Sequence, residues 1–128
     1  MASPRHRERH SLRSRSVPAI VLLSALAACS QNDPSLSDSA NRGRAVYLSF
    51  CVQCHHYYDP FQPGTQGPAV ARASLELLEA KILRGTYPEG HEPAESTREM
   101  PIQPHLKARI PDLHAYLAEV AEPDGEGR

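Results

Sequence analysis

Apolar residues recur at helical spacing in three stretches of the chain, and no stretch alternates apolar and polar residues as a half-buried strand does. The first stretch runs from an N-cap near Asp38 or Ser39 to about Cys51. Gly43, Tyr47 and Cys51 are spaced by four, so they share one helical face. A glycine inside a helix weakens it by about 1 kcal/mol relative to alanine, which indicates a close contact at Gly43.

The second stretch, SLELLEAKILRG, predicts a helix with Ser74 as its N-cap and Gly85 as its stop signal. Its expected apolar stripe comprises Leu75, Leu78 and Ile82.

The third stretch, IPDLHAYLAEV, predicts the end of a terminal helix, with Pro111 best placed near its first turn. Residues 56–73 and 86–105 are interrupted by Pro and Gly and predict two long irregular loops. Three main helices, two long loops and no strand pattern predict a small all-α domain. Such loops would make sense wrapped around a flat, apolar ligand.

The N-terminus has the pattern of an export signal. Residues 1–16 carry five arginines and one acid, and a short apolar run follows from Val17 to Cys29. The run has about 12 residues, whereas a membrane-spanning helix needs roughly 20. The ending LAAC resembles the lipobox of bacterial lipoproteins, which implies cleavage before Cys29 and a lipid on its thiol. The alternative is an ordinary cleaved signal with an incidental cysteine.

These boundaries divide the chain of 128 residues into four parts. We expect a lipoprotein signal peptide at residues 1–28, a flexible lipid-anchored linker at 29–37, one folded domain at 38–121 and a polar tail at 122–128. Without residues 1–28, nine Lys and Arg stand against 14 Asp and Glu, so the net charge is −5. That balance argues against nucleic acid as a partner.

The stretch CVQCHH at residues 51–56 carries the most specific chemistry. Cys-x-x-Cys-His is the attachment signature of c-type haem. The spacing of about one helical turn lets the thiols of Cys51 and Cys54 reach one porphyrin edge, and His55 then becomes the proximal iron ligand. A redox dithiol is less favoured because no strand precedes the pair, and a zinc site is less favoured because no compact second ligand pair exists.

A sixth iron ligand is the next requirement. Met1 leaves with the signal, so a thioether ligand must be Met100, in the second long loop. His91, His56 or His105 could replace it, or the position could be open. Met100 could also be an apolar residue that fills a gap.

With these residues in place, residues 38–121 resemble a class I monohaem cytochrome c. The resemblance rests on the haem motif, the pair Gly67–Pro68, the pair Met100–Pro101, the glycine and aromatic of the first helix and DLHAYL of the last. It implies the small cytochrome c fold, with three helices and two loops around one covalent haem c. It also implies that the Pro68 carbonyl accepts the N–H of His55, and that the last helix crosses the first at Gly43.

The resemblance implies electron transfer with His/Met ligation, by a membrane-anchored carrier or redox subunit on the periplasmic side, rather than enzyme catalysis. The alternative is a haem enzyme or a gas or peroxide sensor with a displaceable sixth ligand. No small-molecule substrate is evident. Four glutamates between Glu89 and Glu99 suggest a redox protein partner with a basic docking patch. Pro111 and the long acidic loop depart from the family pattern, and His56 and the pair Tyr57–Tyr58 have no role in it.

Overall fold

The computed structural model describes residues 32–122, where every regular element is helical and no strand occurs. The predicted all-α class is therefore confirmed for this part of the chain. The predicted signal peptide, Cys29 and all but the first residue of the tail lie outside it. None of the helices within residues 32–122 is long and apolar enough to cross a membrane.

Helix α2 (Asp38–Phe50) begins one residue earlier than the capping pattern predicted, because Ser37 is its N-cap. The Ser37 hydroxyl accepts the Ala40 N–H at 3.1 Å and so satisfies one of the free donors of the first turn. The helix ends where the Cys51 N–H donates to the Tyr47 carbonyl, and it buries the face that contains Gly43 and Tyr47.

The segment before α2 is bonded to the domain over part of its length. The Asp33 N–H donates to Asn41 Oδ1 at 2.7 Å, and the Asn41 amide returns a bond to the Asp33 carbonyl at 2.9 Å. The Ser37 N–H and hydroxyl both donate to the Glu119 carboxylate, each at 2.8 Å, and Leu36 packs against the core. Residues 33–37, which were assigned to the predicted linker, are thus bonded to the folded domain, and residues 29–31 lie outside the described residues.

Helix α3 (Leu75–Glu79) starts at the predicted N-cap, where the Ser74 hydroxyl accepts the Leu77 N–H. It continues as one π-helical turn, η2 (Ala80–Arg84), which ends at Gly85 in the left-handed conformation with φ 69°. The predicted apolar stripe is partly wrong: Leu78 and Ile82 are buried, but Leu75 is exposed. As the first helical residue, Leu75 directs its side chain back beyond the start of the helix.

A 3₁₀ helix that the sequence pattern did not predict, η3 (Pro104–Arg109), leads directly into α4 (Ile110–Glu119). Its buried residue is Leu106. Helix α4 begins at Ile110. Pro111 lies in its first turn, as predicted, since a proline there removes no intrahelical hydrogen bond.

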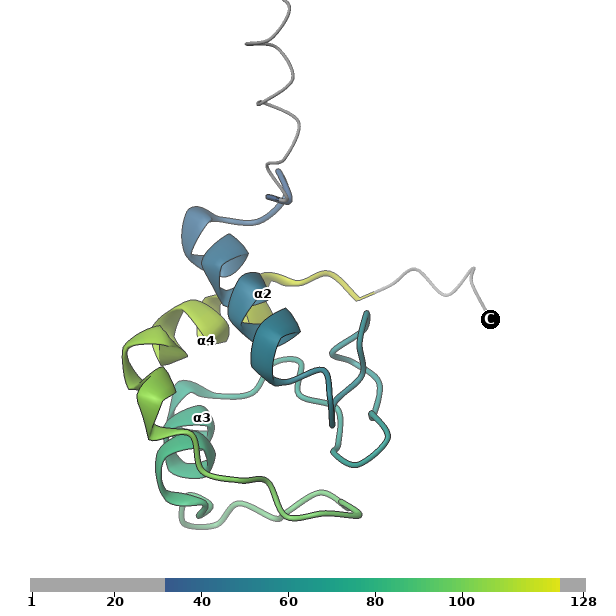
Figure 1. Cartoon of the computed structure of the whole chain (residues 1–128), viewed down its shortest axis with the longest axis vertical. Coiled ribbons are helices and arrows are strands. Elements are labelled where there is room, and N and C mark those ends of the chain that lie inside the picture. Colours follow the sequence, from purple (N-terminus) through teal and green to yellow (C-terminus); the bar gives the residue numbers. More distant parts are fainter. Residues whose placement is uncertain (1–31, 123–128) are drawn as a thin grey trace, which may run out of the picture. The chain divides into compact units, whose positions relative to one another are not determined.

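Helices α2 and α4 pack against each other (Figure 1), and Gly43 lies where their backbones approach most closely. A Cβ atom added at Gly43 would lie 1.9 Å from the Asp112 carbonyl oxygen and 2.9 Å from the Tyr116 Cβ. The crossing therefore needs glycine. Beside it, Asp112 binds Arg42 Nη2 at 2.8 Å and the Ser39 hydroxyl at 2.7 Å, and these bonds lower the pKa of Asp112.

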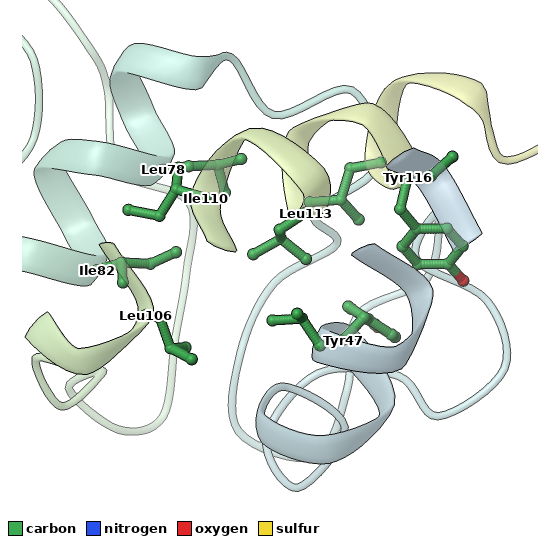
Figure 2. Packing of buried hydrophobic residues seen from close by; sticks show 10 residues of the cluster. Tyr47, Leu78, Ile82, Leu106, Ile110, Leu113 and Tyr116 are labelled. Atoms are coloured by element: carbon green, nitrogen blue, oxygen red, sulfur yellow. The ribbon is translucent and has the colours of Figure 1, made fainter. Parts of the chain in front are cut away.

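The core lies on both sides of α4, which packs against α2 and also against α3. Figure 2 shows Leu113 of α4 among side chains from α2, from α3 with η2, and from η3. Tyr47 and Tyr116 pack with their ring centroids 5.5 Å apart. The main buried apolar residues are Ala40, Val46, Tyr47, Leu78, Ile82, Leu106, Ile110, Leu113, Tyr116 and Leu117.

Replacing Gly43 with Ala should lower the free energy of unfolding by about 2 kcal/mol or more. Overpacking typically costs about 1–3 kcal/mol, and here the added methyl group meets a backbone carbonyl that cannot rotate away. This cost exceeds the gain in helix propensity of about 1 kcal/mol. Urea unfolding followed by circular dichroism measures the change. Ala45→Val, an enlargement on the exposed face of the same helix, is the control; equal stabilities of the two variants would contradict the close crossing.

Candidate cofactor site

The Cys51-x-x-Cys54-His55 motif forms one compact turn after α2. The N–H groups of Cys54 and His55 both donate to the Cys51 carbonyl, at 3.2 and 3.0 Å. This turn places the two cysteines and the histidine within about one helical turn of one another. Both thiols are free and half-buried, and Cys51 also packs against the core.

A cavity of about 790 Å³ lies against this turn. Its size is within the range of about 300–1,000 Å³ that is typical of ligand and cofactor sites. All the predicted site residues within the described chain line it: Cys51, Cys54, His55, Pro68 and Met100. Much of the remaining wall is apolar and includes Val70, Leu77, Leu78, Ile82, Leu113 and Leu117. Cys29, the predicted lipidation site, lies outside the described residues.

His55 is held in one orientation by its neighbours. Its Nδ1 lies 2.8 Å from the Pro68 carbonyl oxygen, as the resemblance implied. Because a carbonyl only accepts, Nδ1 carries the proton and Nε2 keeps a free lone pair for a metal. The imidazole packs against Gly67, where an added Cβ would lie 2.7 Å from His55 Cε1. The Gly-Pro pair therefore supplies both the space and the acceptor for the ring.

The residues after the motif form an ordered turn, and here the sequence analysis missed a role. His56 is half-buried, and its Nδ1 accepts the Asp59 N–H at 3.0 Å and the Tyr58 N–H at 3.3 Å. The Tyr47 hydroxyl donates to the His56 carbonyl. His56 thus fixes the start of the first loop, while Tyr58 remains exposed. In the sequence, the pair of adjacent histidines, His55 and His56, was the feature that could have drawn attention to this role.

Met100 is half-buried, packs against the core and reaches the cavity from the second loop. His91 lines the same cavity, and its ring stacks on Tyr87 with centroids 5.3 Å apart. The Lys81 Nζ lies 4.1 Å from the centre of the same tyrosine ring. The structure therefore brings Met100 and one of its competitors, His91, to the same cavity. His56 and His105 do not line it.

Neither alternative for the cysteine pair, a redox dithiol or a zinc site, gains support from the structure. Burial, with a smaller contribution from Cys54, raises the pKa of the Cys51 thiol to about 12. A redox dithiol needs a thiolate at neutral pH and therefore a lowered pKa. For a zinc site, no group of three or more His, Cys, Asp or Glu side chains within residues 32–122 is placed to hold a metal ion.

Comparison with known proteins returned no matching family model, no matching curated protein and no matching solved structure.

Replacing Gly67 with Ala should break the bond between His55 and Pro68. The added methyl group meets the imidazole ring at 2.7 Å, so the ring must move away from the carbonyl oxygen. Nitrogen NMR of the His55 side chain should then show loss of the single Nδ1–H tautomer. The control is Gly90→Ala, which has only backbone strain at φ 76° and no atom within 4 Å of the added Cβ. An unchanged His55 spectrum in Gly67→Ala would refute the packing argument.

Proposed function

We propose that residues 38–121 form a class I cytochrome c domain that carries one covalent haem c and transfers electrons. The observation that carries the proposal is the meeting of five residues on one apolar cavity: Cys51, Cys54, His55, Pro68 and Met100. The contact between His55 Nδ1 and the Pro68 carbonyl is the one that the resemblance implies, which supports the proposal.

Each of these residues has a defined task in the proposal. Cys51 and Cys54 form thioethers with the haem vinyl groups, and the motif turn keeps both sulfurs at one side of the cavity. His55 binds iron through Nε2, because Nδ1 is held by Pro68. Met100 provides the sixth ligand, and thioether ligation favours the reduced state of the iron. When bound, the haem supplies reversible one-electron exchange.

The lining also explains why a covalent apolar group suits this chain. Leu77, Leu113 and Leu117 face a space that no side chain of the domain fills. A domain of about 90 residues gains much of its stability from apolar burial, and a haem that packs against these leucines would extend the core. The pattern of a thiol pair, an oriented imidazole and an apolar wall thus favours a haem over a substrate.

The central test is the spectrum of Met100→Ala beside the wild type. Haem staining after denaturation should label both proteins, because the thioethers remain, while Cys51→Ala/Cys54→Ala should lose the stain. The wild type should show six-coordinate low-spin haem with a weak methionine–iron band. In Met100→Ala this band should vanish, an external ligand such as cyanide should bind at once, and the reduction potential should fall. A wild-type spectrum in Met100→Ala would transfer the sixth position to another residue, with His91 first.

The proposal includes export and anchoring through a lipid on Cys29. Replacement of Cys29 with Ser removes the thiol that would be acylated, so the protein should leave the membrane fraction or stay unprocessed. Cell fractionation and mass measurement of the mature N-terminus decide between these results. The control is Ser30→Ala, the next residue. A correctly cleaved Cys29→Ser protein that resists washing from membranes would rule the anchor out.

The partner is proposed to carry a basic docking patch. Glu92 and Glu99 line the cavity, whereas Glu89 and Glu95 do not. The cavity wall also holds three cations, Arg72, Lys81 and Arg98, which outnumber these two carboxylates. The cavity wall is therefore not acidic, and a basic patch on the partner would have to meet the exposed glutamates of the loop.

Charge reversal at Glu92 and Glu99 should slow oxidation of the reduced protein by tris(phenanthroline)cobalt(III), a cationic oxidant. It should speed oxidation by anionic hexacyanoferrate(III), and salt should weaken both effects, since the Debye length is about 8 Å at physiological ionic strength. The expected change is about threefold to tenfold at low salt. Reversal at Glu76 and Glu79, exposed on α3 and away from the cavity, is the control. Equal rates in both variants would place electron exchange at another face.

A further inference from the structure

The segment that carries Met100 has little packing of its own. Every residue from Glu89 to Glu99 is exposed, and Met100 is the first half-buried residue after them. Gly90 has a positive φ of 76° and no neighbour near its Cβ position. Burial alone therefore does not explain what keeps Met100 at the cavity.

Hydrogen bonds from this segment converge on one residue of the opposite loop, Gln66. The Thr97 N–H donates to the Gln66 carbonyl at 3.0 Å, and the Ser96 hydroxyl lies 2.8 Å from the same oxygen. Arg98 Nη1 donates to Gln66 Oε1 at 3.3 Å. On its other side, the Gln66 N–H donates to the Cys54 carbonyl at 3.1 Å. Gln66 thus joins the motif turn to the segment that ends at Met100, and it lines the cavity between them.

We infer that Gln66, Ser96 and Arg98 form a latch that holds Met100 in place and so limits the access of external ligands to the proposed iron site. This inference rests on the proposed function. Gln66 and Ser96 are positioning residues. They do not bind the iron themselves, but they determine how often the segment that carries Met100 opens. An external ligand binds only the open form, so its apparent affinity is reduced by the fraction of molecules that are open.

The size of the effect follows from the bonds. A hydrogen bond of this kind shifts an equilibrium by about twofold to tenfold. Loss of the Ser96 hydroxyl and the Gln66 side-chain acceptor leaves the Thr97 backbone bond in place. The fraction of molecules that are open, and with it the apparent affinity for imidazole, should therefore rise by about tenfold. The remaining Thr97 bond prevents a larger increase.

The test compares Ser96→Ala/Gln66→Ala with Ser49→Ala/Gln62→Ala. The second variant is the control, because it makes the same two substitutions at positions that do not line the cavity. The Ser49 hydroxyl donates to the Ala45 carbonyl within α2. Imidazole titration of the oxidised protein should show about tenfold tighter binding in the latch variant and no change in the control. Arg98→Met, which removes the donor to Gln66 Oε1, should give part of the same effect.

Exchange of the Thr97 amide hydrogen provides a second readout that needs no haem. It should accelerate by about tenfold in the latch variant, while exchange in the core of α4 stays unchanged. Covalent haem in the wild type with equal imidazole affinities in all variants overturns the latch and leaves the proposed function intact. An unchanged Thr97 exchange rate, or faster exchange without tighter imidazole binding, overturns it as well. Absence of haem stain in the wild type sinks the proposed function, and with it the latch as a control of iron access.

Discussion

The contact between the Gly43 Cα and the Asp112 carbonyl is the constraint on which the rest of the structure depends. It sets α2 and α4 at backbone distance, which no larger residue than glycine permits. Because α2 ends at Cys51 and α4 presents Leu113 and Leu117, this crossing also brings the motif turn and one apolar wall to the same cavity. The geometry of the site is thus a consequence of a packing requirement some distance from it.

The sequence predicted the helices well where each has its own end signals. Ser74 and Gly85 bound the second helix as expected, because a side-chain cap and a left-handed glycine act locally. The 3₁₀ helix from Pro104 escaped notice, since a six-residue element is too short to show periodicity. The π turn at Ala80–Arg84 is equally invisible, because the same apolar residues suit a regular α-helical turn.

The candidate site also combines residues that are close in the sequence with residues that only the fold brings together. Cys51, Cys54 and His55 lie within one turn, so their spacing alone predicts how they meet. That Pro68 reaches the same cavity could be expected only from the family resemblance, since the loop that carries it has no periodic pattern. Met100 was expected there also because it is the one methionine besides Met1. The hydrogen bonds of His56 and Gln66 could not be predicted, because the positions of their backbone and side-chain partners are set by the folded loops.

The pairing of the first and last helices has a consequence for the order of events during synthesis. Ser39 and Asp112 bond across 73 positions, so α2 has no partner until nearly the whole domain has emerged. Leu113 and Leu117, which form one wall of the cavity, are therefore synthesised after the Cys51–His55 turn. Until then, this side of the turn is exposed to solvent. The thiols of Cys51 and Cys54 are thus accessible until the terminal helix packs against the domain. Contacts between such distant segments form late, because the loop between them must be closed first.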